Sequence, residues 1–167
     1  MRRVRASAKV LAVAADAEHV VVAVEEGVGQ AFKASSGEPR ATFTVDAGVQ
    51  AMALGAETLF TLGPSGLRAH ERQSLDVTAR VASPVSAIAA RGDLVAVGDR
   101  SGRVRVLSGA ELRESGAFSA GEGSIGLSIT NKPVVVAAGA RVILRAVPPW
   151  QALSPIALRG VVTAFAA

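Results

Sequence analysis

The sequence predicts an all-β fold in which one structural unit recurs along the chain. Apolar segments of similar pattern begin at five places, which are Val10, Val49, Val85, Ile125 and Val161. Their starts lie about 39, 36, 40 and 36 residues apart. Turn glycines keep a similar period of about 39, 36 and 37 residues and are Gly27, Gly66, Gly102 and Gly139. Because two independent features share one period, we interpret the chain as a repeat.

The third repeat shows the strands of the unit most clearly. We expect its strands at residues 85–90, 94–99, 103–108 and 112–118. In the third strand Val104 and Val106 alternate with Arg103 and Arg105, so one face is buried and the other is wet. The second strand is more continuously apolar, with Leu94, Val95, Ala96 and Val97 in a row, as in a strand covered on both faces. A helix over 112–118 is the alternative for the last segment.

The other repeats follow the same plan. The expected strands are 10–15, 19–24, 28–33 and 41–45 in the first repeat, 49–55, 58–62, 67–72 and 77–81 in the second, and 125–130, 134–138 and 141–147 in the fourth. Prolines at 148, 149 and 155 interrupt the last strand of the fourth repeat, which we expect to be short, bent or absent.

A period of this length is typical of four-stranded propeller blades. The sequence therefore predicts an all-β, propeller-like array of about four antiparallel four-stranded blades in a single domain, residues 1–167. The expected blades are roughly 10–48, 49–84, 85–124 and 125–160, with orphan strands at 3–8 and 161–167. An apolar strand such as 161–167 is a liability if it stays exposed, so we expect association with a protein partner or with further copies of the chain.

Composition narrows the setting of the protein. The 167 residues include no cysteine, which fits a reducing compartment, and the net charge of +4 is modest. No apolar run reaches the roughly 18 residues of a membrane span, so we expect a soluble, cytoplasmic protein with no membrane partner. The N-terminus imitates a secretory signal, which is the alternative, but Lys9 leaves only a short apolar run behind it.

The string V-G-D-R-S-G-R-V-R-V-L, residues 97–107, resembles the hairpin of WD40 repeats and of related quinoprotein-like propellers. The WD40 pattern would place Trp at Leu107 and Asp at Ser108, and the chain lacks this dipeptide in every repeat. The resemblance implies a propeller that acts as a protein-interaction scaffold. It does not carry over the histidine and aspartate network of WD40 blades.

Candidate binding residues are few. Basic side chains on equivalent hairpins of two blades could form a stripe for phosphate or an acidic partner, and these are Arg100, Arg103, Arg105, Arg141 and Arg145. A solvated face is the alternative, and since no aromatic residues are interleaved we expect no nucleic acid. Trp150, next to two prolines, is either a partner anchor or a plug over the last blade.

No arrangement of residues points to catalysis. His19 and His70 lack a carboxylate at ligand spacing and are expected to be structural or exposed. Aspartates lie at turns, and no serine has the nucleophile-elbow context. We therefore expect no catalytic, cofactor or metal site, and a non-catalytic interaction scaffold. The alternative is part of a larger or oligomeric propeller with a ligand-binding or enzymatic axial site, and the sequence leaves a small-molecule ligand open.

Overall fold

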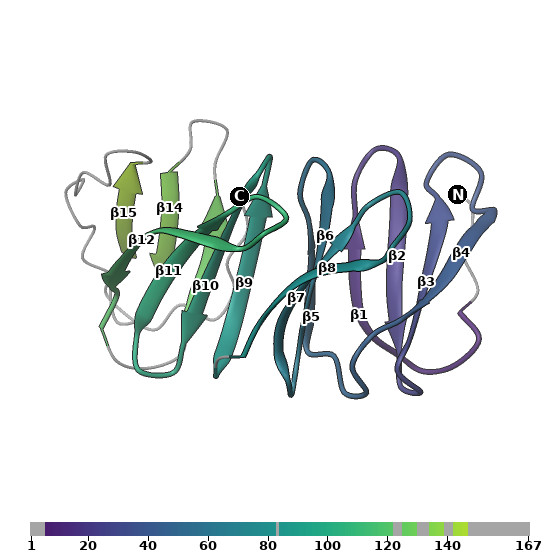
Figure 1. The fold of residues 1–167 in the computed structure, drawn as a ribbon, viewed down its shortest axis with the longest axis horizontal. Coiled ribbons are helices and arrows are strands. Elements are labelled where there is room, and N and C mark those ends of the chain that lie inside the picture. The colour runs from purple at the N-terminus through teal and green to yellow at the C-terminus, as the bar shows by residue number, and fades with distance from the viewer. Residues whose placement is uncertain (1–5, 83, 122–124, 130–133, 139–141, 147–167) are drawn as a thin grey trace. The chain divides into compact units, whose positions relative to one another are not determined.

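The computed structural model describes residues 6–82, 84–121, 125–129, 134–138 and 142–146. In these ranges the chain is all-β, with no helix, and each of its first three sheets has four antiparallel strands (Figure 1). The prediction of four-stranded antiparallel blades is confirmed. The chain divides into two compact units, Met1–Ser83 and Pro84–Ala167, which are described separately. The expectation of a single domain stays a prediction.

The first sheet lies in the N-terminal unit and is a meander of consecutive strands. It consists of β1 (Val10–Ala15), β2 (His19–Val24), β3 (Val28–Lys33) and β4 (Pro39–Thr44). The first three strands have the predicted bounds. The fourth begins two residues earlier than expected, at Pro39. Proline has no backbone N–H to donate, but it is tolerated at the first residue of a strand.

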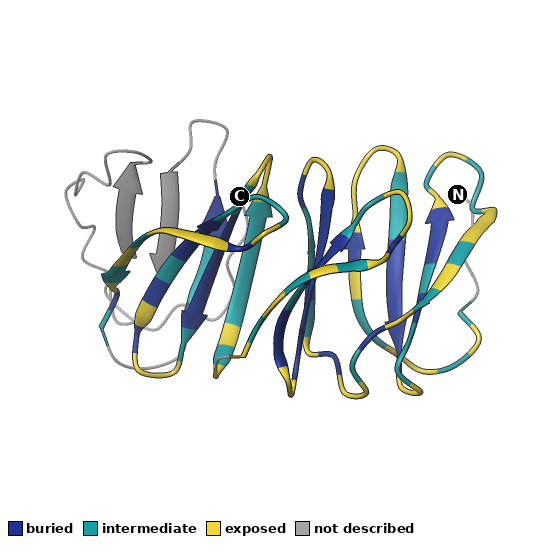
Figure 2. Cartoon of the chain, viewed as in Figure 1, coloured by how far each residue is buried: buried dark blue, intermediate teal, exposed yellow. Residues whose placement is uncertain are grey.

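The second sheet belongs to the same unit and repeats this order. It consists of β5 (Ala51–Leu54), β6 (Thr58–Gly63), β7 (Gly66–Glu71) and β8 (Val77–Val81). All six residues of β6 are buried, so in the second sheet the second strand is covered on both faces, as predicted for this strand of the blade (Figure 2).

The third sheet lies in the C-terminal unit. It consists of β9 (Val85–Arg91), β10 (Leu94–Asp99), β11 (Arg103–Ser108) and β12 (Arg113–Ser119). The alternative of a helix over 112–118 is wrong, because Arg113–Ser119 forms a strand that pairs with β11. Val104 and Val106 of β11 are buried, whereas Arg103 is exposed, as the alternation predicts.

The fourth sheet has three described strands, β13 (Gly126–Ile129), β14 (Val134–Ala138) and β15 (Val142–Ala146). The interrupted last strand of this blade and the orphan strand at 161–167 lie outside the described residues. Of the orphan strand predicted at 3–8, the structure describes only residues 6–8, which form a bend and not a strand.

Each unit has an apolar core between its two sheets. In the N-terminal unit, Ala14, Val21 and Ala31 of the first sheet pack against Met52 and Leu59 of the second. In the C-terminal unit, the buried core residues are Ala96, Val104, Val106, Ala120, Ile125 and Ile129. Since a sheet buries its apolar face only against a neighbour, this stacking is what makes the repeat stable.

In the described part of the chain, no helix is long and apolar enough to cross a membrane.

Candidate interaction surfaces

The first sheet has an apolar face that is turned away from the second sheet, and we call it the outer face. Paired residues of neighbouring strands lie on the same face of a sheet, and residues two apart along a strand share that face. The pairs of Val10 with Val24 and of Val13 with Val22 therefore belong to one face. Val22, Val24 and Phe32 form its buried cluster.

The N-terminal segment at residues 6–8 covers part of the outer face. Ala6 and Ala8 pack against the apolar cluster. The side chain of Gln30 donates to the Ser7 hydroxyl at 2.6 Å and accepts a hydrogen bond from the Ser7 backbone N–H at 3.3 Å. This double contact holds the segment across the middle of the sheet.

On both sides of this segment the outer face stays open. Val10 is 41% and Val13 is 56% exposed, and they are the exposed large hydrophobic side chains among the described residues. Toward β3 and β4 the face is hollowed into a groove of about 590 Å³, lined among others by Phe32 and Pro39. An open apolar face with a groove is a feature of interaction surfaces.

The corresponding face of the second sheet is covered by the first sheet. Met52 on β5 pairs with Thr61, as Val13 on β1 pairs with Val22, so Met52 and Val13 occupy equivalent positions. Met52 is only 9% exposed, because it packs against the first sheet. Within the N-terminal unit, the second sheet therefore buries against the first sheet a position that the first sheet leaves exposed.

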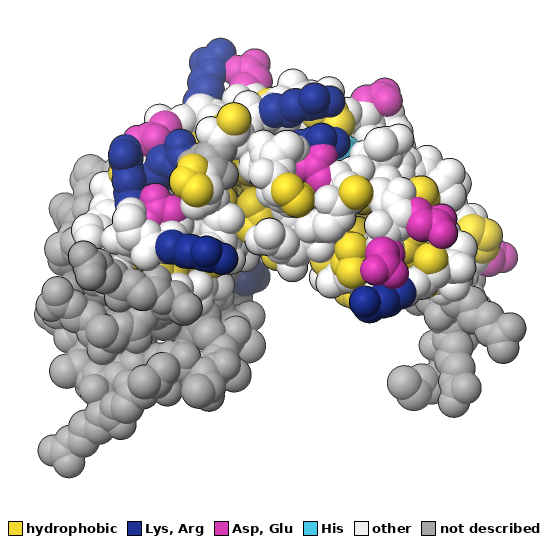
Figure 3. Space-filling model, turned by 90° about the horizontal axis from the view of Figure 1, so that it is seen from below, with side chains coloured by type: hydrophobic (Ala, Val, Ile, Leu, Met, Phe, Trp, Pro, Cys, Tyr) yellow, Lys and Arg dark blue, Asp and Glu magenta, His cyan; other side chains and the backbone are white. Residues whose placement is uncertain are grey.

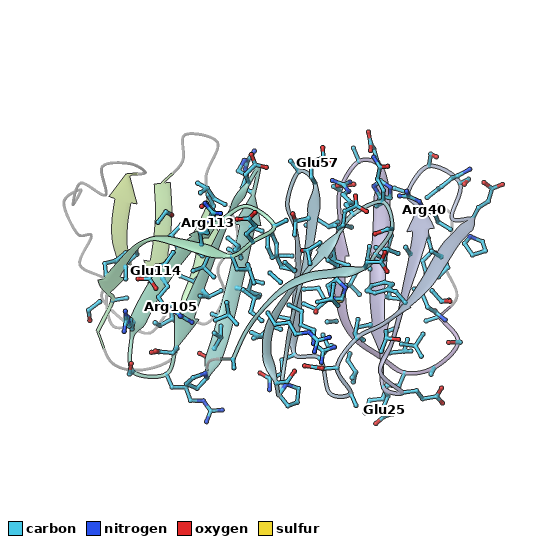
Figure 4. The ribbon with its side chains drawn as sticks, viewed as in Figure 1. Glu25, Arg40, Glu57, Arg105, Arg113 and Glu114 are labelled. Carbon is cyan, nitrogen blue, oxygen red and sulfur yellow. The ribbon has the colours of Figure 1, made fainter. Side chains whose placement is uncertain are left out.

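A second candidate surface is a polar cleft of about 420 Å³ at one end of the two sheets of the N-terminal unit. Its charged and polar lining includes Glu18, His19, Lys33, Arg40, Glu57 and Arg72. Figure 4 shows Arg40 and Glu57 at the same end of their sheets, with Glu25 at the opposite end.

Arg72, which lines this cleft, connects the two sheets through its hydrogen bonds and an ion pair. Its guanidinium donates to the carbonyl oxygens of Gly55 at 3.1 Å and Ala56 at 2.9 Å, and it forms an ion pair with Asp16 of the first sheet. Burial raises the pKa of Asp16, but hydrogen bonds from the backbone N–H groups of His19 and Glu18, together with Arg72, outweigh burial and lower it. Asp16 is therefore ionised at neutral pH and fixes Arg72 in place.

His70 is a buried polar residue inside the second sheet. Its Nδ1 lies 3.2 Å from the carbonyl oxygen of Leu75, which can only accept, so Nδ1 carries the proton. Its Nε2, 3.0 Å from the hydroxyl of Thr61, then accepts. Burial lowers the pKa of His70, and Arg68 and Arg80 lower it further, so the ring is neutral and structural, as the sequence predicts.

The position of His70 links the structure to the motif considered in the sequence. In each four-stranded sheet, one residue of the third strand pairs with the second residue of the second strand. These equivalent residues are Phe32, His70 and Leu107. His70 therefore stands where Leu107 stands in the third sheet, which is the position of Trp in the WD40 pattern. A hydrogen-bonded aromatic ring fills this place in the second sheet alone among the three four-stranded sheets.

The arginines predicted to bind a partner are only partly described. Arg103 is 60% exposed and lies 3.9 Å from the carboxylate of Glu114, whereas Arg105 is half-buried with an Nη2 atom that has no hydrogen-bond partner among the described residues. Arg100 is exposed in the turn between β10 and β11. Arg141 and Trp150 lie outside the described residues, and Arg145 is placed only as a member of β15.

The charged side chains do not form a continuous basic stripe in the view of Figure 3, where acidic and basic side chains are interspersed over the described surface. Sequence reasoning missed the cleft because Arg72 and Asp16 are 56 residues apart and meet only when the two sheets stack. It missed the open valines because exposure depends on which sheet has a neighbour.

No protein-family model matches the chain, and no curated protein matches it in sequence. Solved structures are similar in fold. The structure titled "Crystal structure of RRP9 WD40 repeats" matches with a TM-score of 0.73 and 15% identity over 89% of this chain and 51% of that one. A chain of the mitotic checkpoint complex matches with a TM-score of 0.78 and 13% identity over 94% of this chain and 53% of that one.

The computationally designed Ika4 protein matches with a TM-score of 0.71 and 13% identity, over 85% of this chain and 93% of that one. These similarities and the four-stranded antiparallel sheets define the class: the chain has the fold of a WD40-like β-propeller. It spans about half the length of the RRP9 and checkpoint chains that it matches.

Proposed function

We propose that the chain is a non-catalytic protein-interaction module. Its WD40-like fold supports this general kind of function, since propellers of this class typically present faces and loops to other proteins. The observation that carries the proposal is the open outer face of the first sheet. Val10 and Val13 are exposed there, whereas the equivalent Met52 is buried under a neighbouring sheet.

The partner that fits this face is a β-sheet that packs as the first sheet packs on the second. Either a further copy of the chain or a blade of another protein could present such a sheet. Burying a valine side chain completely contributes about 1.5–3 kcal/mol, so covering two half-exposed valines is worth about 2 kcal/mol. The groove beside Phe32 adds apolar area to the same contact.

The arginines of the third sheet are a proposed secondary contact. Arg100 and Arg103 are exposed near one end of β11 and carry positive charge toward an acidic partner. Because Glu114 partly neutralises Arg103, we expect these residues to influence the rate of association more than its strength.

Site-specific photo-crosslinking tests the proposal. A photoreactive amino acid replaces Val13 in one variant and Ala47, an exposed residue of the connection between β4 and β5, in the control. We expect a discrete protein adduct from position 13 and little from position 47 when the chain is irradiated in its source cells. Mass spectrometry of the adduct then distinguishes a second copy from another protein. Equal labelling at the two positions, or no adduct at position 13, contradicts the proposal.

A further inference from the structure

Residues 6–8, which we call the strap, divide the outer face of the first sheet into two open areas. Val10 and Val13 are exposed in one area, and the groove beside Phe32, which Ser7 of the strap also lines, is the other. Sheets that pack face to face lie about 10 Å apart with interdigitated side chains, which leaves no room for a further backbone segment between them. A sheet that docks on the whole outer face therefore has to displace the strap.

The strap makes the apolar contacts that a neighbouring sheet makes elsewhere in the N-terminal unit. Leu59, the second residue of β6, is fully buried in the core that the second sheet shares with the first. Val20, the second residue of β2, occupies the equivalent position in the first sheet. It belongs to the apolar cluster of the outer face, which Ala6 and Ala8 of the strap complete. The strap thus lies where a preceding sheet would lie.

The strap also replaces a polar contact of this kind. Gln30 and Arg68 are equivalent, because each pairs with the fourth residue of the second strand of its sheet. Arg68 forms an ion pair with Asp46, which follows the last strand of the first sheet, so this position of the second sheet reaches the preceding sheet. Gln30 reaches Ser7 of the strap instead, as a donor and as an acceptor. The strap therefore stands in for a preceding sheet in both its apolar and its polar contacts.

The strap is held by few contacts and has a fixed end at which it can turn away. Residues 6–8 form a bend, and both hydrogen bonds between Ser7 and Gln30 join exposed groups, so water can replace them. At the fixed end, the carbonyl oxygen of Lys9 accepts a hydrogen bond from the Glu25 N–H at 3.0 Å, and the Lys9 ammonium lies 3.8 Å from the Glu25 carboxylate. Because two alanine side chains bury less apolar surface than a sheet does, a docking sheet can displace the strap.

We infer that the strap is an autoinhibitory element, which covers the middle of the outer face in the free chain and competes with the partner sheet for it. Displacement of the strap joins the exposed valines and the groove beside Phe32 into one apolar surface. Breaking the contact between Ser7 and Gln30 should therefore uncover Val22, which is buried in the cluster under the strap, and strengthen partner binding. This inference deepens the proposed function and rests on it.

Thiol labelling tests the strap in the free chain, because the sequence has no cysteine of its own. The reporter is Val22→Cys on the outer face, and the control reporter is Val21→Cys, whose site is buried on the inner face against the second sheet. An aromatic disulfide reagent is the probe, and each reporter is combined with the double change Ser7→Ala and Gln30→Ala. Ser7→Thr, which keeps the hydroxyl, is the matched control for the loss of the contact.

We expect the double change to speed labelling at position 22 about fivefold or more and to alter labelling at position 21 by less than about twofold. Ser7→Thr should leave both rates near those of the parent chain. An unchanged rate at position 22 overturns the inference. An equal rise at both positions also overturns it, because the whole sheet and not the strap has then loosened.

Photo-crosslinking at position 13 tests whether the strap and the partner compete. The purified chain with the photoreactive residue at position 13 is irradiated in an extract of its source cells in three forms. The first form is the parent chain, and the second carries Ser7→Ala and Gln30→Ala. In the third, Ser7→Cys and Gln30→Cys are bridged by a short bis-maleimide that holds the strap closed, and the same chain without the bridge is its control.

We expect the yield of the adduct to rise about threefold or more when the contact is removed and to fall by a similar factor when the strap is bridged. The unbridged cysteine chain should give at least the yield of the parent chain. Equal yields in all forms overturn the inference and leave the proposed function standing. Absence of an adduct from every form contradicts the proposed function and the inference with it.

Discussion

The first and second sheets have the same strand order and a bulge at the same place in the fourth strand, yet one of them presents side chains that the other buries. Val13 of the first sheet is 56% exposed, and the equivalent Met52 is 9% exposed. The residue at the bulge of the fourth strand differs as well. In the first sheet this residue is Arg40, which lines the polar cleft, and in the second sheet it is Thr78, whose hydroxyl donates to the carbonyl oxygen of Ala69. The comparison teaches two things. The apolar positions that recur in both sheets form the strands of the blade, and the positions at which the two sheets differ in residue type or in burial are those that face solvent in the first sheet.

Removing His70 should have the largest effect on stability. The ring is fully buried and bonded to Thr61 and Leu75, so His70→Ala leaves a cavity and an unpaired carbonyl group. We expect a loss of about 3 kcal/mol in the free energy of unfolding, measured by urea denaturation. Thr61→Val, which removes only one hydrogen bond, should cost about 1 kcal/mol. A loss below that of Thr61→Val would show that His70 is not a core residue.

The equivalent residues Met52 and Val13 give the next largest contrast. Met52→Ala should cost about 2 kcal/mol because it empties a place between the two sheets. Val13→Ala should change the stability of the isolated chain by less than about 0.5 kcal/mol, since the side chain is more than half exposed. Equal losses for the two variants in urea denaturation would contradict the difference in burial.

A third contrast concerns how the two sheets fill the same space. Gly29 pairs with Phe43 in the first sheet, where the second sheet pairs Leu67 with Val81. A Cβ atom added at Gly29 would lie 2.3 Å from the Phe43 ring. We expect Gly29→Ala to cost about 2 kcal/mol in thermal denaturation.

The double variant Gly29→Ala with Phe43→Leu separates a clash from a general effect of alanine. It should be more stable than the sum of the single changes predicts, because the smaller side chain makes room. Additive losses would show that the ring does not occupy this space.

The pH dependence of stability should carry a smaller signature of His70. Burial lowers its pKa below the ordinary value of 6.5, so the unfolded chain binds a proton that the folded chain does not. The stabilisation is therefore complete above the ordinary value and is lost as the pH falls below it. We expect wild type to lose about 1 kcal/mol more than His70→Asn between about pH 7 and about pH 5.5. Parallel pH profiles for the two proteins would contradict a lowered pKa.

Much of the fold follows from the sequence alone. Strands such as His19–Val24 and Leu94–Asp99 have the predicted bounds, because continuous apolar runs end at turn residues that the sequence displays. The bulge at Arg40 does not, since it depends on the pairing register of two strands and not on the pattern within one. The polar cleft is harder still, because it needs the stacking of two sheets to bring Arg72 to His19.

The basic hairpin at Arg103 and Arg105 also shows which features the sequence predicts and which it does not. Alternation placed Arg103 and Arg105 on the face of β11 opposite to the buried valines. It could not indicate that Glu114 on the neighbouring strand approaches Arg103, or that part of the Arg105 side chain is buried. Local patterns thus predict faces, and partners across strands decide which charges stay available.

Hydrogen–deuterium exchange tests most directly whether the first sheet is an open interaction surface and the second a covered one. The free chain is compared with the chain in the complex that crosslinking at position 13 identifies. We predict that amide exchange in β1, Val10–Ala15, slows markedly on complex formation, while exchange in β5, Ala51–Leu54, stays unchanged because that strand is already covered. Unchanged exchange in β1, or protection confined to β5, would contradict the account.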